Sequence, residues 1–98
     1  MKSNLIIHPG LYLKEDVIEA NQLSVTKAAE LLGVTRVNLS NILNEKTNIS
    51  ASMAIRISQV FGGTADIWLK LQMQYDLVVE QKKFEENKIH LAKYEPVL

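Results

Sequence analysis

The sequence predicts an all-α domain of five helices, and three observations support that fold class. The 98 residues include only 4 glycines and 2 prolines, too few for a turn-rich β architecture. Capping residues and glycines divide the chain at short intervals, as helix starts and ends require. Between them, apolar residues recur every three or four positions. A chain of this length forms one domain, so we expect a core at about 8–80 and an irregular extension over 81–98.

The first three predicted helices are short, and each follows a turn or a capping side chain. Pro9-Gly10 precedes the first helix, and we interpret the neighbouring His8 as a structural turn residue. Ser24 and Thr35 are suited to cap the second and third helices, because a side-chain oxygen can accept from a free N–H in the first turn. The expected ranges are 11–21, 25–32 and 36–44.

The fourth and fifth helices are predicted at 51–61 and from 65 to 82 or beyond. Ser50 caps the fourth helix, which stops at Gly62-Gly63, and Thr64 is expected to cap the fifth. Asp66 stands in the first turn of the fifth helix, where a negative charge suits the helix dipole. Three residues of this helix are expected as core or dimer-interface positions: Trp68, Gln72 and Tyr75.

Residues 24–43 have the spacing of a helix-turn-helix. Two short helices that cross closely need small residues at the contact, and Ala28-Ala29 supplies them. The turn needs a residue that tolerates a left-handed backbone, which Gly33 provides. Leu39, Ile42 and Leu43 then hold the second helix to the core, so its polar residues point elsewhere.

That outward polar face carries the groups that read the DNA major groove. Arg pairs with guanine, Asn pairs with adenine, Ser or Thr serves either base, and an apolar group contacts the thymine methyl. The residues expected to face bases are Thr35, Arg36, Val37, Ser40 and Asn41. The residues expected near phosphates are Thr26, Lys27, Asn44, Lys46 and Asn48. The alternative is a solvated polar face on a helix pair that binds no DNA.

Charge and composition restrict the other function classes. Eleven basic residues balance eleven acidic ones, and residues 24–50 carry a net charge of only +1, so a DNA reader of this kind is expected to act as a dimer. The chain has no Cys, no known catalytic motif and no apolar run long enough for a membrane helix. We therefore expect a cytoplasmic protein that is not an enzyme and uses no metal or cofactor.

From His8 onward the sequence resembles the HigA family of antitoxins, also called virulence-associated protein I, which are small repressors of the Xre class. The resemblance covers about 70 of the 98 residues. Its matching segments are His8-Pro9-Gly10, Leu23-Ser24, Ala28-Ala29, Leu32-Gly33-Val34-Thr35-Arg36, Leu43-Asn44, Ile49-Ser50, 53–58, Phe61-Gly62, Trp68-Leu69-Lys70-Leu71-Gln72 and Tyr75-Asp76-Leu77.

The resemblance implies a five-helix lambda-repressor-like fold and the antitoxin role of a type II toxin-antitoxin module. Such an antitoxin is a homodimer that binds operator DNA, represses its own operon and neutralises a cognate toxin, typically a RelE-like mRNA endonuclease. The apolar groups within 5–7 and 89–98 are candidates for the toxin surface. Two alternatives remain open: a stand-alone regulator of the phage-repressor type, and a protein-binding module that has lost DNA binding.

Three positions depart from the family pattern. Val25 replaces a Gln that follows the cap of the second helix, and Asn41 stands where the family often has Arg. Glu45 replaces the Gly that usually follows Asn44, so a left-handed backbone there would be strained by about 1 kcal/mol or more. We expect these changes to weaken DNA binding or to shift its base preference.

Overall fold

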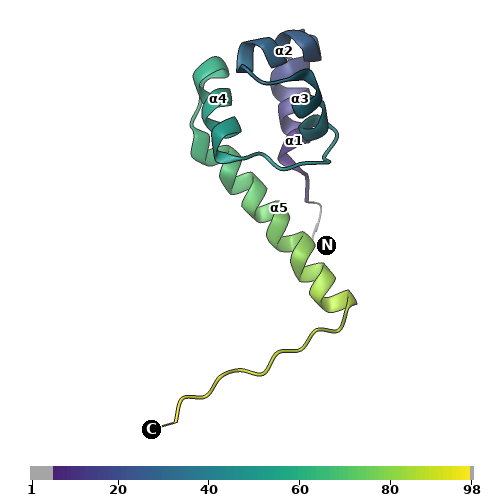
Figure 1. Cartoon of the computed structure of the whole chain (residues 1–98), viewed down its shortest axis with the longest axis vertical. Coiled ribbons are helices and arrows are strands. Elements are labelled where there is room, and N and C mark those ends of the chain that lie inside the picture. Colours follow the sequence, from purple (N-terminus) through teal and green to yellow (C-terminus); the bar gives the residue numbers. More distant parts are fainter. Residues whose placement is uncertain (1–5, 98) are drawn as a thin grey trace, which may run out of the picture.

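The computed structural model describes residues 6–97, which fold into five helical segments followed by an arm without regular structure (Figure 1). A short helix continues directly into a π-helical segment, and four further helices follow. Their bounds are α1 (Pro9–Tyr12), η1 (Leu13–Glu19), α2 (Val25–Leu32), α3 (Arg36–Leu43), α4 (Ala51–Phe61) and α5 (Ala65–Glu86). Residues 6–97 contain no β-strand, which confirms the predicted all-α class.

The first helix begins and ends two residues earlier than its predicted range of 11–21. It starts at Pro9 because the Nδ1 atom of His8 accepts the N–H of Gly10 at 2.9 Å, which makes His8 the N-cap. A proline in the first turn lacks an N–H that would otherwise be unpaired. The helical segment ends at Glu19, and the chain turns at Gln22 with φ 57°.

Three of the four predicted caps make the expected hydrogen bond. Ser24, Thr35 and Ser50 accept backbone N–H groups at 3.0, 3.1 and 3.1 Å. Thr64 occupies the N-cap position of α5, but its side chain accepts no backbone N–H there. α2 ends at Gly33, which has the left-handed φ of 70° that the helix-turn-helix spacing requires.

The core lies where all the helices meet, and every helical segment contributes apolar side chains to it. Its buried apolar residues are Leu13, Ile18, Ala28, Ala29, Leu32, Leu39, Ile42, Leu43, Ile49, Met53, Ala54, Ile57 and Trp68. Helix α1 contributes the buried Pro9, the partly buried Tyr12 and a close backbone contact. A Cβ atom on Gly10 would overlap the carbonyl oxygen of Ile42, so α1 lies directly against the end of α3.

Helix α5 is 22 residues long, and only its first half has residues buried in this core. The remainder projects from the bundle, which gives the molecule extents of 58 × 34 × 26 Å (Figure 1). The helix continues to Glu86, in agreement with the predicted end at 82 or beyond, so the irregular part of the extension begins after it. No helix within 6–97 is long and apolar enough to cross a membrane.

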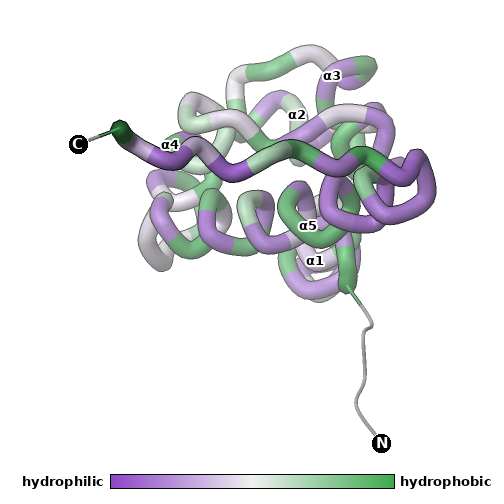
Figure 2. The backbone as a smooth tube through the Cα atoms, turned by 90° about the horizontal axis from the view of Figure 1, so that it is seen from below, coloured by the Kyte–Doolittle hydropathy of each residue, from purple (hydrophilic) through white to green (hydrophobic). Residues whose placement is uncertain are grey.

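The chain leaves α5 through a turn with two defined hydrogen bonds. The N–H of Lys88 donates to Glu85 at 3.2 Å, and the N–H of Ile89 donates to Phe84 at 3.0 Å. This pairing is a Schellman motif, in which Lys88 takes the left-handed position with φ 52°. Residues 89–97 follow as an exposed arm, in which apolar and polar residues succeed one another (Figure 2).

Candidate nucleic-acid interface

The α2–turn–α3 unit holds α3 with one face on the core and the rest exposed. Ala28 and Ala29 are 0% and 3% exposed, so the two helices approach each other through small side chains. Val34 packs against the core cluster in the angle between the two helices. On α3 itself, Leu39, Ile42 and Leu43 are buried, as the spacing predicted. The face opposite these three residues is therefore the one that another molecule can reach.

The structure brings the predicted base-facing residues together at the start and outer side of α3. Thr35, Arg36 and Val37 are exposed, and Val37 has 68% of its surface free. Ser40 and Asn41, one turn further along, are half-buried. At 100° per residue, Val37 and Asn41 lie opposite the buried face, with Arg36 and Ser40 beside them. Which of them contact bases stays a prediction.

Asn44 lies on the same outer face, although the sequence placed it among the phosphate contacts. Its Nδ2 atom donates to the Oγ atom of Ser40 at 3.2 Å. The hydrogen bond joins two polar side chains of consecutive turns on the exposed side of α3. Each side chain thus restricts the rotamers of the other, which reduces the entropy lost when either group binds a partner.

The other predicted phosphate contacts are exposed and lie on two segments that flank α3. Thr26 and Lys27 are in the first turn of α2, while Lys46 and Asn48 lie in the loop between α3 and α4. Lys27 also forms a 3.9 Å ion pair with Glu30, which is exposed and therefore weak. All four side chains remain accessible to a backbone phosphate.

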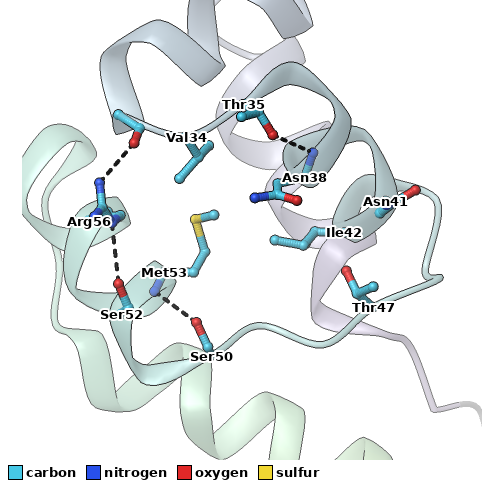
Figure 3. A pocket seen from close by; sticks show the side chains of 11 residues that line it. Val34, Thr35, Asn38, Asn41, Ile42, Thr47, Ser50, Ser52, Met53 and Arg56 are labelled. Atoms are coloured by element: carbon cyan, nitrogen blue, oxygen red, sulfur yellow. Dashed lines mark hydrogen bonds between the residues drawn. The ribbon is translucent and has the colours of Figure 1, made fainter.

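A polar hollow of about 570 Å³ separates α3 from α4 (Figure 3). Amide and hydroxyl groups from both helices and from the loop that joins them line it. The lining residues are Gly33, Val34, Thr35, Asn38, Asn41, Ile42, Thr47, Ser50, Ser52, Met53 and Arg56. Asn38 is exposed and faces this hollow, because it lies 100° further round α3 than Val37.

Arg56 is a residue that sequence reasoning did not select. Its Nη1 atom donates to the carbonyl oxygens of Leu32 and Gly33 at 2.9 and 3.1 Å, and its Nε atom donates to Ser52 at 3.3 Å. A cation at the C-terminus of α2 suits the helix dipole and satisfies carbonyls that the helix leaves unpaired. Arg56 thus links α4 to the helix-turn-helix and also forms one wall of the polar hollow. These bonds span 23 and 24 residues, so no local pattern could reveal them.

Two of the three departures from the family pattern have a visible structural effect. Glu45 adopts φ 62°, the left-handed conformation expected where the family has Gly. Val25 is half-buried and packs against the core cluster, so it offers no polar group at the start of α2. That these two changes weaken contacts with a phosphate backbone stays a prediction.

The three predicted dimer-interface residues are largely used inside the protomer. Trp68 is 9% exposed and belongs to the core. Gln72 is 5% exposed, accepts the N–H of Ile49 at 2.8 Å and donates to Asp76 at 2.9 Å. Tyr75 is half-buried with its ring 4.9 Å from that of His8, in an edge arrangement. These contacts leave Trp68 and Gln72 little surface for a second copy, so an interface role stays a prediction chiefly for Tyr75.

The C-terminal part of the predicted toxin surface lies in solvent, whereas Ile6 and Ile7 of its N-terminal part are half-buried. Tyr94 is 81% exposed and Val97 is 95% exposed, while Leu5 and Leu98 lie outside the described residues. Within residues 6–97, no three His, Asp or Glu side chains lie close enough together to hold a metal ion.

The chain is similar to known helix-turn-helix proteins. A helix-turn-helix family model matches residues 15–68. Virulence-associated protein A' of Dichelobacter nodosus is 45% identical over 71 residues, which make up 71% of this chain and 61% of that protein. The chain thus spans about three-fifths of the length of that relative.

Two solved antitoxin structures match almost the whole chain. Antitoxin GraA superposes with a TM-score of 0.86 at 31% identity, covering 95% of this chain and 100% of that one. Antitoxin HigA of Pseudomonas aeruginosa, solved with the higBA promoter, superposes with a TM-score of 0.82 at 31% identity. That match covers 96% of this chain and 100% of the other.

Proposed function

This chain belongs to the HigA family of helix-turn-helix antitoxins, and we propose that it is the homodimeric antitoxin of a type II toxin-antitoxin module. In this role it binds the operator of its own operon through α3 and represses transcription. It also neutralises a cognate toxin, a RelE-like mRNA endonuclease, by binding it. Because its proposed target is operator DNA, we place it in the cytoplasm.

The exposed face of α3 is the observation that carries the DNA-binding part. This face presents a guanidinium, an apolar group and amides on the side of α3 that is turned away from the core. Arg36 can pair with guanine, Val37 can contact a thymine methyl, and Asn41 can pair with adenine. The Ser40–Asn44 hydrogen bond holds a further donor and acceptor on the same side.

The phosphate backbone would be held mainly by neutral donors. Residues 24–50 carry a net charge of only +1, so long-range attraction to DNA is weak for one protomer. Side-chain hydroxyls and amides such as Thr47 and Asn38 can still bond phosphate oxygens at the rim of the polar hollow. Two copies double the contacts and fit half-sites about one helical turn apart, roughly 34–36 Å.

Fluorescence anisotropy with a duplex from upstream of the gene for this chain tests the proposal. We expect log K to fall linearly with log salt, with a slope near −0.9 for each phosphate that a Lys or Arg side chain neutralises. Arg36→Ala should weaken binding of the dimer about 30-fold or more, because one guanine contact worth about 1–3 kcal/mol is lost in each of two half-sites. Lys82→Ala removes the same charge from exposed α5 and should leave affinity unchanged. Equal affinities for the two variants would show that Arg36 does not contact the bases of the operator.

A second candidate, a protein-binding module without DNA binding, is favoured by Glu45. Its carboxylate follows α3 directly and would repel nearby phosphates. Absence of salt-dependent binding to the upstream duplex would favour this alternative.

Co-expression of the tagged chain with the product of an adjacent small gene tests the antitoxin part. A stable complex with a product that is toxic alone supports it, whereas no complex and no toxicity favours a stand-alone regulator.

A further inference from the structure

Helix α5 contacts the segments before and after α3 through two side chains on one of its faces. Gln72 and Tyr75 are three residues apart, so both side chains lie on the same side of α5. The Oε1 atom of Gln72 accepts the N–H of Ile49, in the chain that follows α3, at 2.8 Å. The ring of Tyr75 lies 4.9 Å from the ring of His8, which precedes α1. One face of α5 therefore holds two segments that are distant in the sequence.

The contact with His8 continues to α3 through close packing. The His8 side chain is 2% exposed, and its Nδ1 atom accepts the N–H of Gly10 at 2.9 Å. Gly10 lies between this ring and α3, because a Cβ atom there would overlap the carbonyl oxygen of Ile42 and come within 3.0 Å of the His8 Nδ1 atom. Packing this tight transmits a displacement of the ring instead of absorbing it.

The carbonyl group of Ile42 belongs to the hydrogen-bonded end of α3. It accepts the N–H of Glu45 at 3.0 Å, and the carbonyl group of Asn41 accepts the N–H of Lys46 at 2.8 Å. This pairing is a Schellman motif with Glu45 in the left-handed position. Asn41 is also one of the predicted base-facing residues. The end of α3 that contacts α1 thus carries a group that is expected to meet the DNA.

The two ends of α3 are held by different helices. Arg56 of α4 donates to the carbonyl oxygens of Leu32 and Gly33, in the turn before α3. The other end is held by α5, through Gln72 and through the segment 8–10. Hydrogen bonds to base edges tolerate little displacement, so a helix that reads bases must be fixed by the residues that support it.

From these contacts we propose that His8 and Tyr75 are positioning residues for operator binding. Their ring contact fixes the end of α3 relative to α5, so that Asn41 and its neighbours meet the bases in one geometry. Without this contact, the end of α3 has to be ordered when DNA binds, and the lost entropy lowers the affinity. The inference rests on the proposed reading of operator DNA by α3 and adds that α5 sets the placement of α3.

The variant His8→Asn separates the ring contact from the helix cap. Asparagine is a favoured N-cap, so its side-chain oxygen can still accept the N–H of Gly10, but it offers no ring to Tyr75. By fluorescence anisotropy we expect affinity for the upstream duplex to fall at least about threefold. Affinity for a duplex of scrambled sequence should stay unchanged, because non-specific binding depends on charge. The salt slope should also stay unchanged, since no phosphate contact is lost.

Two variants of Tyr75 form a matched pair. Tyr75→Phe keeps a ring at the same place and should retain the native ratio of affinities for the upstream and scrambled duplexes. Tyr75→Leu should lower this ratio as His8→Asn does. The double variant, His8→Asn with Tyr75→Leu, should lower it no further than either change alone, because both changes remove the same contact. Effects of the two changes that add in full would overturn the proposal.

A loss of folded protein has a different signature. It weakens binding to both duplexes by the same factor, since only the folded fraction binds, and the ratio of affinities does not change. Phe61→Leu is the control, because Phe61 packs partly buried against the core at the C-terminal end of α4. It should lower the thermal unfolding midpoint and keep the native ratio. If His8→Asn also keeps the native ratio, the contact only stabilises the fold and the proposal is wrong.

Amide hydrogen exchange tests the same contact without DNA. The N–H of Asn44 donates to the carbonyl oxygen of Ser40 at the end of α3, and the N–H of Ala54 donates to that of Ser50 at the start of α4, each at 2.9 Å. In His8→Asn we expect faster exchange at Asn44 and native exchange at Ala54, because the loosening is local to α3. Native exchange at both positions would contradict the positioning role.

The outcomes separate this inference from the proposed function. A native chain that binds the upstream and scrambled duplexes equally would refute operator reading, and the positioning role would fail with it. A native chain that prefers the upstream duplex, with the same preference in His8→Asn, would leave the proposed function standing and overturn this inference alone.

Discussion

Helices α3 and α5 are the two elements through which this chain is proposed to meet other molecules, and they are held in different ways. α3 has eight residues, three of them buried, and lies among α1, α2 and the chain leading to α4. α5 has 22 residues, of which Trp68 and Gln72 are buried near its start. Its second half projects beyond the bundle and contains no buried residue.

The difference separates two kinds of recognition surface. A short helix that is supported on several sides presents its outer side chains in one geometry, as the reading of base edges requires. A projecting helix end with an adjoining arm can adapt to the surface that it meets, at the cost of ordering its residues on binding. Substitutions beneath α3 should therefore lower the free energy of unfolding, while substitutions on the outer side of α5 should change the affinity for another protein chain.

The largest expected effect is at the contact beneath α3. Gly10→Ala places a methyl group on the carbonyl oxygen of Ile42, so α1 and α3 must move apart. We expect a loss of about 3 kcal/mol in the free energy of unfolding, measured by urea denaturation. Gly63→Ala is the control, because no atom lies near its Cβ and only its φ of 77° opposes alanine. Equal losses at the two glycines would show that α1 does not press on α3.

The next effect concerns the inner half of α5. Gln72→Leu leaves the buried N–H of Ile49 without its acceptor, because within residues 6–97 no other side chain accepts a hydrogen bond from it. We expect a loss of about 1–3 kcal/mol in the free energy of unfolding. Gln74→Leu, an exposed change on the same helix, should fall within about 0.5 kcal/mol of the native value. If both variants behave alike, the inner half of α5 is not anchored through Gln72.

A smaller and opposite effect is expected where α3 ends. Glu45→Gly relieves a left-handed φ of 62° and should raise the free energy of unfolding by about 1 kcal/mol. It also removes a charge that opposes phosphates, so operator affinity should rise in the anisotropy assay. Lys88→Gly relieves a similar φ of 52° at the end of α5 and should stabilise the chain without changing operator affinity. Glu45→Gln isolates the charge, because it keeps the strained backbone.

The smallest effect is a pH dependence at the start of α5. A hydrogen bond from the Thr64 side chain holds the pKa of Asp66 below its usual value, and Lys70, 3.4 Å away, acts in the same direction. A lowered pKa contributes stability that is present above the unfolded-state pKa and is lost as pH falls through the folded-state pKa. Asp66→Asn should therefore unfold slightly more easily at neutral pH. Its difference from the native chain should disappear in acid, and a difference that persists there would contradict this origin.

Features that depend on local chemistry could be predicted from the sequence. The caps Ser24, Thr35 and Ser50 and the left-handed Gly33 each follow from a residue and its immediate neighbours. The left-handed backbone at Glu45 was expected only because the resembled family has Gly at that position. The buried and exposed sides of α3 followed from its apolar spacing. Local rules succeed here because capping and helix periodicity act within one or two turns.

Features that depend on distant partners could not be predicted. Arg56 bonds carbonyls 23 and 24 residues away, and Gln72 bonds an N–H 23 residues away. Trp68 was expected in the core or at an interface, and only packing of α5 on α4 decides that its protomer buries it. Asn38 belongs to the polar hollow because α4 stands beside it, which no property of α3 reveals.

The contact between His8 and Tyr75 has a consequence for observing this molecule. Because Nδ1 of His8 accepts the N–H of Gly10, the ring hydrogen of the neutral imidazole is on Nε2. Nε2 is buried without a hydrogen-bond partner in the described chain, and the tyrosine ring stands 4.9 Å away at 70°. This hydrogen is thus shielded from solvent exchange and lies within the ring current of an aromatic neighbour. In a proton NMR spectrum, the shifted resonance of this Nε2 hydrogen would show whether His8 remains packed against Tyr75 of α5.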